Sequence, residues 1–364
     1  MLKIVTIVGA RPQFIKAAAV SRVIRDQYPD EFEEIIVHTG QHFDENMSRV
    51  FFDDLDIPEP KFNLEISGGS HGAMTGRMLE SIEQVLVDEK PDWVLIYGDT
   101  NSTLAGALAA SKLHIPVAHV EAGLRSFNMR MPEEINRILA DRVSTLLFCP
   151  TDTAVKNLEE EGFKSGVHNV GDVMYDAALF YRARAERHSN IHQKLGLEKG
   201  RYVLATCHRA ENTDNRSNLS QILDALVDIS KDAPVVLPIH PRTAKLIVDY
   251  GFQEQMKHLL VAEPQPFLDM IALERDSKVI LTDSGGVQKE ALFYGVPCIT
   301  MREETEWVET VELGCNFLAG ASRAKIIDAY NRIKLGESKV VNAQPYGAGN
   351  AASGLLKIMS EYAS

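Results

Sequence analysis

Acidic residues that could move protons follow two neighbouring strand-like segments of the sequence. Asp99 comes directly after the apolar run 93–97, and Glu121 comes at the end of the run 115–120. Positioned carboxylates can accept and donate protons, and like charges held close together cost stability unless they have a function. We therefore expect these two residues to do chemistry. Asp99 has a second explanation that stays open here, which is the capping of the helix that begins at Asn101.

Two basic residues lie where the first strand passes into the first helix. Residues 3–8 form a buried strand-like run, and Arg11 and Lys16 follow it. Pro12 suits the first turn of a helix, where its missing N–H costs nothing. The free N–H groups of a helix start favour anions, and open α/β sheets bind ligands at such crossings. This segment fits an anion site and an ordinary strand-to-helix turn equally well.

The second half of the chain has a similar arrangement. His208 follows the strand-like run 202–206, and Ser284, Gly285 and Gly286 lie between the run 278–282 and a helix. Bare backbone N–H groups at that point can approach a phosphate closely. Glu290 lies too far along the helix to cap it, and its carboxylate could accept hydrogen bonds from a ribose diol. These residues together predict a nucleotide site.

Strand-like and helical segments alternate along the whole chain, which predicts an α/β fold with two doubly wound, Rossmann-like domains facing across a cleft. The expected strands are residues 3–8, 35–39, 93–97, 115–120, 145–149, 202–206, 235–239, 258–262, 278–282 and 297–301. We expect an N-terminal domain at 1–172 with the carboxylates and a C-terminal domain at 173–347. The C-terminal stretch 348–364 has a helical pattern and can pack back on the first domain. Functional residues should gather at the carboxyl ends of the strands.

Composition excludes several classes of function. The chain has 364 residues, 45% of them hydrophobic and 24% charged, as in soluble globular proteins. Its formal charge of −13 disfavours nucleic acid as a partner. The apolar runs are strand-sized and no signal peptide is recognisable, so we expect a cytoplasmic protein without a membrane span.

Other kinds of site lack their motifs. The four cysteines are scattered, which predicts reduced buried thiols and no zinc site. No dinucleotide fingerprint, P-loop or metal motif occurs, so we expect no cofactor and no metal. His38, His119 and His240 lie on or beside strands and are expected to be hydrogen-bonded structural residues.

Six motifs occur in one order over nearly the whole chain: "GARPQFIK", "GDTNST", "HVEAGLR", "MPEEINR", "HRAEN" and "TDSGGVQKEA". Together they resemble the non-hydrolysing UDP-N-acetylglucosamine 2-epimerase family. The resemblance implies the two-domain fold of the GT-B glycosyltransferases, a UDP-sugar as the partner, isomerase activity and a homodimer.

The resemblance also implies roles for particular residues. The catalytic positions it implies are Asp99, Glu121, Glu133 and His208. The substrate-binding positions it implies are Arg11, Lys16, Gln265 near the uracil, Ser284, Gly285, Gly286 and Glu290. For Glu134, beside Glu133 in the first turn of a helix, we expect only a favourable interaction with the helix dipole.

Several stretches, such as "RSFNMRMPEEINRIL", are similar to a narrower branch of the family. That branch acts on UDP-2,3-diacetamido-2,3-dideoxy-D-glucuronate and forms the mannuronate epimer used in bacterial lipopolysaccharide O-antigen. A glucuronate carries a C6 carboxylate, for which Arg130 is the first candidate partner and Arg125 the second. The alternatives are a UDP-N-acetylglucosamine 2-epimerase, a glycosyltransferase of the same fold, and a non-catalytic UDP-sugar-binding protein.

Two segments depart from the parent pattern. Trp307 and Val308 stand where the family commonly has Arg-Pro, which removes an implied contact to a neutral sugar. Phe43 and Asp44 follow "GQH" where a basic residue is usual. Since that region belongs to an activator site in several relatives, activation by UDP-N-acetylglucosamine is not expected.

Overall fold

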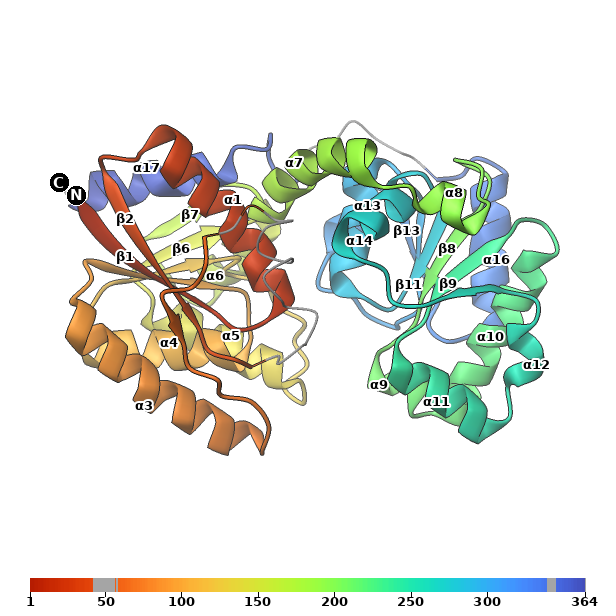
Figure 1. Cartoon of the computed structure of the whole chain (residues 1–364), viewed down its shortest axis with the longest axis horizontal. Coiled ribbons are helices and arrows are strands. Elements are labelled where there is room, and N and C mark those ends of the chain that lie inside the picture. The colour runs from red at the N-terminus through yellow and green to blue at the C-terminus, as the bar shows by residue number, and fades with distance from the viewer. Residues whose placement is uncertain (42–55, 57, 339–344, 364) are drawn as a thin grey trace. The chain divides into compact units, whose positions relative to one another are not determined.

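The computed structural model describes residues 1–41, 56, 58–338 and 345–363. These residues form two compact units (Figure 1). Unit 1 contains Met1–Ala177 and Gln344–Ser364, and unit 2 contains Ala178–Ala343. The division falls within helix α7 (Val173–His188), and the expected boundary between residues 172 and 173 lies at the start of the same helix.

Unit 1 contains a parallel sheet of seven strands in the order β3-β2-β1-β4-β5-β6-β7. Its strands are β1 (Leu2–Val8), β2 (Phe32–His38), β3 (Phe62–Asn63), β4 (Trp93–Tyr97), β5 (Val117–Val120), β6 (Leu146–Cys149) and β7 (Val167–Asn169). Its helices, besides the first part of α7, are α1 (Arg11–Gln27), α3 (His71–Glu89), α4 (Asn101–Lys112), α5 (Pro132–Val143), α6 (Asp152–Glu160) and α17 (Ala351–Ala363). Strands β1 and β4 are almost fully buried, as runs of apolar residues inside a parallel sheet should be.

Unit 2 contains a second parallel sheet, with the strand order β10-β9-β8-β11-β12-β13. Its strands are β8 (Val203–Thr206), β9 (Val235–Pro238), β10 (Leu260–Ala262), β11 (Val279–Thr282), β12 (Cys298–Thr300) and β13 (Asn316–Leu318). Its helices, after the rest of α7, are α8 (Ile191–Leu195), α9 (Ala210–Thr213), α10 (Arg216–Ser230), α11 (Pro241–Tyr250), α12 (Gln253–Met256), α13 (Phe267–Arg275), α14 (Gly285–Tyr294), α15 (Val308–Glu312) and α16 (Arg323–Lys334).

The strand order in both sheets reverses beside the first strand of each unit, so both are doubly wound. The predicted fold class of two doubly wound α/β domains is therefore confirmed. All ten predicted strands are present, and the three that the sequence did not indicate are β3, β7 and β13. Each of these three lies at a sheet edge and has only two or three residues.

The C-terminal helix belongs to unit 1, although more than 170 residues of the chain separate it from the rest of that unit. It packs against α1, where the Tyr28 hydroxyl lies 3.5 Å from Ser353 Oγ. The Tyr362 ring meets Trp93 at 5.5 Å between centroids. The N–H groups of Ala351 and Ala352 donate to the Asp176 carboxylate, which fixes the start of the helix.

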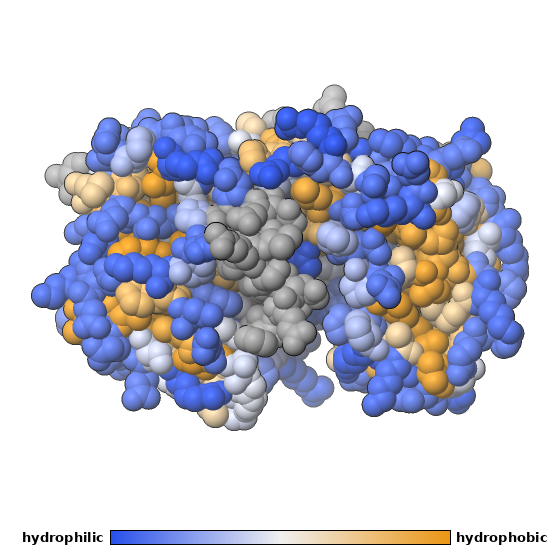
Figure 2. Space-filling model, in the orientation of Figure 1, coloured by the Kyte–Doolittle hydropathy of each residue, from blue (hydrophilic) through white to orange (hydrophobic). Residues whose placement is uncertain are grey.

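All four cysteines are buried and free, as predicted. Hydrophilic residues cover most of the surface seen in Figure 2, with apolar residues between them. Within the described part of the chain, no helix is long and apolar enough to span a membrane.

Candidate active site

The end of strand β5 carries the first candidate catalytic residue in unit 1. Glu121 follows β5 directly and has a φ of 72°, a left-handed backbone that glutamate rarely adopts. Its carboxylate forms an ion pair with Lys16 of α1, and both side chains are nearly buried. A Cβ at Gly98, which follows β4, would lie 3.5 Å from Glu121 Oε2 and 3.6 Å from Lys16 Nζ. The predicted anion-binding lysine is thus held against a predicted catalytic carboxylate.

The neighbouring strand end carries the second candidate. The Asp99 carboxylate follows β4, is partly exposed and is paired with the buried guanidinium of Arg137 from α5. The Asn136 side chain donates to the Asp99 carbonyl oxygen at 2.9 Å. Asp99 and Glu121 are therefore paired with different cations. Sequence reasoning missed Arg137, because a basic residue within an amphipathic helix gives no signal of its target.

A buried histidine supports the backbone between these two carboxylates. His119 lies 2.7 Å from Asp141 Oδ1 through Nδ1 and 2.7 Å from the Gly98 carbonyl oxygen through Nε2. Burial raises the pKa of Asp141, but the hydrogen bond and charge of His119 and the charge of Arg125 hold it below its ordinary value. The prediction that His119 is a hydrogen-bonded structural residue is confirmed, and its target is the residue that precedes Asp99.

The two arginines of the loop before α5 have different surroundings. The buried Arg125 guanidinium lies 2.6 Å from Glu161 Oε1 and 2.7 Å from Asp141 Oδ2, so it is already neutralised within unit 1. These two ion pairs make Arg125 a poorer candidate than Arg130 for binding a substrate carboxylate. Arg130 is exposed, and its backbone N–H donates to Asn128 Oδ1 at 3.1 Å. Glu133 is half-buried in the first turn of α5.

Gln13 joins the two turns that carry the basic and acidic residues. Its Oε1 accepts hydrogen bonds from the N–H groups of Gly9 and Ala10 at 2.8 and 3.0 Å. Its Nε2 donates to the Tyr97 carbonyl oxygen at 2.7 Å. The half-buried Arg11 is the first residue of the same helix. Sequence reasoning missed Gln13 because glutamine is common in helices and because Tyr97, on the neighbouring strand, is 84 positions away in the chain.

In unit 2, a buried carboxylate holds the turn that carries His208. Asp283 follows β11, is fully buried and accepts hydrogen bonds from the backbone N–H groups of His208 and Arg209 at 3.1 and 3.0 Å. Partial burial lowers the pKa of His208, as do the charges of Arg209 and His240, although Asp283 acts to raise it. The imidazole is therefore neutral near pH 7 and can accept a proton.

The start of α14 has the geometry of an anion site. Ser284 precedes the helix, and its side chain makes no capping hydrogen bond to the helix start. A Cβ at Gly285 would collide with the Glu306 carboxylate, so packing against Glu306 explains why a glycine fits this position. A Cβ at Gly286 would meet only Ser284 Oγ at 3.9 Å and Glu290 Oε2 at 4.0 Å. A ligand can therefore approach the backbone at Gly286.

The sequence singled out three further positions, one of them a pair of residues in unit 1. Gln265 lies between β10 and α13 and donates to the Glu263 carbonyl oxygen at 2.6 Å. Trp307 is buried and packs under Lys289, whose Nζ lies 3.9 Å from the indole centroid. Phe43 and Asp44, which bear on activation, lie outside the described residues.

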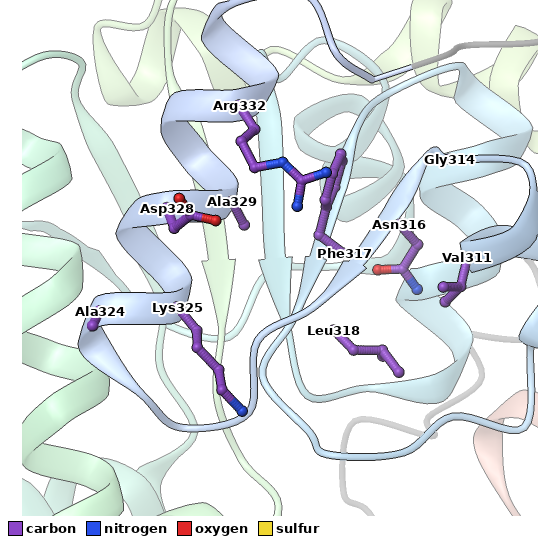
Figure 3. A pocket seen from close by; sticks show the side chains of 10 residues that line it. All are labelled: Val311, Gly314, Asn316, Phe317, Leu318, Ala324, Lys325, Asp328, Ala329 and Arg332. Atoms are coloured by element: carbon purple, nitrogen blue, oxygen red, sulfur yellow. The ribbon is translucent and has the colours of Figure 1, made fainter.

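A pocket of about 640 Å³ lies elsewhere in unit 2, between edge strand β13 and helix α16 (Figure 3). Arg332 lies over the Phe317 ring there, at 5.0 Å from the centroid. None of the predicted site residues lines this pocket. Among the described residues, no group of three or more histidines, cysteines or carboxylates could hold a metal. In each unit, the candidate residues therefore remain those at the carboxyl end of its own sheet.

Known proteins resemble the chain over its whole length. A sequence profile of the family described as "UDP-N-acetylglucosamine 2-epimerase" matches residues 26–360. The chain is 54% identical to the UDP-2,3-diacetamido-2,3-dideoxy-D-glucuronate 2-epimerase of Pseudomonas aeruginosa, over 99% of this chain and all of that relative. It is 43% identical to the UDP-N-acetylglucosamine 2-epimerase of Methanocaldococcus jannaschii, over 99% of each.

Solved structures agree with these sequence matches. The M. jannaschii epimerase in complex with UDP-GlcNAc and UDP superposes with a TM-score of 0.90, covering 99% of this chain and 100% of that one. The Neisseria meningitidis UDP-GlcNAc 2-epimerase, bound to UDP-GlcNAc, gives 0.89 at 30% identity, with the same coverage. The chain therefore belongs to the UDP-N-acetylglucosamine 2-epimerase family, whose members invert a UDP-sugar at C2 without hydrolysing it.

Proposed function

We propose that the chain converts UDP-2,3-diacetamido-2,3-dideoxy-D-glucuronate to its mannuronate epimer by inversion at C2, for bacterial lipopolysaccharide O-antigen. The choice of this substrate is supported by the 54% identity, over the whole length, to a relative named for this activity. The exposed Arg130 supports it, because burying a C6 carboxylate without a cation would be costly.

The reaction proceeds by elimination and re-addition of UDP. One carboxylate removes the C2 proton, the electron pair of the C2–H bond forms a C1–C2 double bond, and the C1–O bond breaks toward UDP. A second carboxylate then protonates the opposite face of C2 while the UDP oxygen returns to C1. This needs at least two carboxylates, and Asp99, Glu121 and Glu133 are the three candidates.

The cations beside the carboxylates fit this chemistry. Arg137 is paired with Asp99 and Lys16 with Glu121, so each of these two carboxylates is held in place by a cation. Arg11 and Lys16 of unit 1 are proposed to bind the diphosphate. His208, neutral near pH 7, is the remaining catalytic candidate.

UDP binding is assigned to residues of unit 2. The backbone at Ser284, Gly285 and Gly286 holds phosphate oxygens at the start of α14, where the helix dipole favours negative charge. Glu290 accepts hydrogen bonds from the ribose, and Gln265 lies near the uracil. Hydrogen bonds and charges that stabilise the diphosphate make UDP a better leaving group, which lowers the barrier to elimination.

The second candidate function is the conversion of UDP-N-acetylglucosamine to UDP-N-acetylmannosamine. The 43% identity to the M. jannaschii epimerase supports it. NMR of both UDP-sugars, incubated side by side with the enzyme, distinguishes the two. Our proposal expects the mannuronate epimer to form faster than the N-acetylmannosamine one, and the reverse order would reject it. The family resemblance further supports a cytoplasmic homodimer.

A further inference from the structure

The loop between β5 and α5 holds an aromatic residue in an unfavourable conformation. Phe127 has a φ of 58°, in the left-handed region that bulky residues avoid, and its side chain is 77% exposed. A ring so exposed has little packing against unit 1 that could offset the strain. Strained residues of this kind persist only where their surroundings hold them, and they gather at functional sites.

A buried carboxylate holds this backbone in place. Glu134, which is 1% exposed, accepts hydrogen bonds from the N–H groups of Ser126 and Phe127 at 3.0 and 2.9 Å and from Ser126 Oγ at 2.9 Å. We expected Glu134 only to favour the helix dipole, and the structure shows that it fixes a loop. Three hydrogen bonds to one buried carboxylate make the loop conformation hard to relax.

The same carboxylate is connected to the candidate catalytic site. Arg137 Nη1 lies 3.0 Å from Glu134 Oε2, and the other terminal nitrogen of Arg137 is paired with Asp99. The position of Phe127 and the orientation of Asp99 therefore depend on one arginine. The loop also begins at Glu121, so both ends of it join the carboxylate site.

We propose that Phe127 contacts the sugar of the substrate, forming an apolar wall against its C–H face and acetamido methyl groups. This inference rests on the proposed function, since it takes a UDP-sugar as the ligand. An exposed aromatic ring in a fixed position gains affinity when an apolar surface covers it, with little loss of side-chain freedom. The strain in the free enzyme is thus offset by contact in the complex.

Titration calorimetry with UDP-2,3-diacetamido-2,3-dideoxy-D-glucuronate and with UDP alone tests the proposal. The Phe127→Ala variant should bind the UDP-sugar roughly 10- to 100-fold more weakly, the factor expected from burying one aromatic side chain. Its affinity for UDP alone should not change. The control Met129→Ala removes another exposed apolar side chain, 61% exposed, from the same loop and should leave both affinities unchanged.

A Phe127→Gly variant separates this role from a structural one. Glycine accepts a positive φ without strain. The melting temperature of the Phe127→Gly variant should therefore be no lower than that of the wild type, while the affinity of the variant for the UDP-sugar falls. Unchanged UDP-sugar affinity in both variants would overturn the inference. So would dissociation of an oligomer in ultracentrifugation, which would assign the ring to a second copy. Neither result bears on epimerisation itself, which solvent labelling of C2 measures separately.

Discussion

Arg125 and Arg130 differ in what already neutralises them, although five positions separate them in one loop. The Arg125 guanidinium is buried between Asp141 and Glu161, whereas Arg130 is exposed. A cation that recognises a substrate carboxylate must be able to form a new pair. Only Arg130 of these two meets that condition.

Replacing Arg130 by alanine should therefore affect the two UDP-sugars unequally. A bidentate pair with the C6 carboxylate is worth about 2 kcal/mol, which is roughly thirtyfold in kcat/KM. We expect that loss for the glucuronate and little change for the residual turnover of UDP-N-acetylglucosamine, measured in parallel assays. Lys156→Ala, which removes an exposed cation from α6, is the control. Equal losses on both sugars would show that Arg130 is not the specificity residue.

Residue positions at strand ends could be predicted, whereas their partners could not. Asp99 and Glu121 were found because each follows an apolar run, and that rule needs only the local sequence. Arg137 reaches Asp99 across 38 positions of the chain, and Gln13 reaches Tyr97 across 84. Such pairs depend on how the strands are ordered in the sheet, and no local pattern contains that order.

Helix α14 gives a prediction at the scale of an element. Replacing Gly286 by alanine adds a methyl group that would make only ordinary van der Waals contacts, in a helical conformation that alanine favours. Stability should rise by about 0.5–1 kcal/mol. UDP affinity should fall by roughly tenfold or more, since the methyl group lies where a phosphate would approach. Thermal unfolding and calorimetry measure the two effects.

The neighbouring glycine provides the contrast. Gly285→Ala should not give the stabilisation expected at Gly286, because its methyl group would require the Glu306 carboxylate, which is paired with Arg302, to move. Gly76→Ala on α3, another helical glycine with open space around it, should stabilise without changing UDP binding. If Gly286→Ala bound UDP as tightly as the wild type, the phosphate would have to be placed elsewhere.

Most of the strands that the sequence indicated are buried apolar runs, although the three-residue edge strand β10 was indicated as well. Strands β1, β4 and β8 are apolar runs flanked by helical periodicity, and the sequence indicated all three. Strands β3, β7 and β13 have two or three residues, and each lies at a sheet edge where one side has no neighbouring strand. Segments so short carry no periodic pattern. Backbone pairing with an already formed neighbour makes them strands.

A titratable contact joins α7 to the C-terminal helix α17 within unit 1. Asp176 of α7 accepts hydrogen bonds from the start of α17. Burial raises the pKa of Asp176 from 3.8 to about 6, although those N–H groups of Ala351 and Ala352 act to lower it. A raised pKa in the folded state means that its contribution to stability is complete below pH 3.8 and is lost as the pH rises through 6.

Asp176→Asn should remove this dependence of the free energy of unfolding on pH. Relative to the wild type, the variant should gain roughly 2 kcal/mol in the free energy of unfolding between pH 4 and pH 7, at 1.36 kcal/mol for each pKa unit. Denaturant unfolding at both pH values measures it. The control is Asp26→Asn, at an exposed carboxyl whose pKa the hydrogen bond from Arg25 lowers, so it should not show this gain. Parallel pH curves for wild type and Asp176→Asn would reject this role of the contact.

Solvent labelling of the sugar tests the central claim most directly. The enzyme is incubated with UDP-2,3-diacetamido-2,3-dideoxy-D-glucuronate in heavy water, and the products are followed by NMR and mass spectrometry. Inversion through loss and return of the C2 proton predicts one deuterium at C2 of the mannuronate epimer. A chain that only bound or transferred the sugar would leave C2 unlabelled. An unlabelled C2 in recovered substrate and product alike would contradict the account.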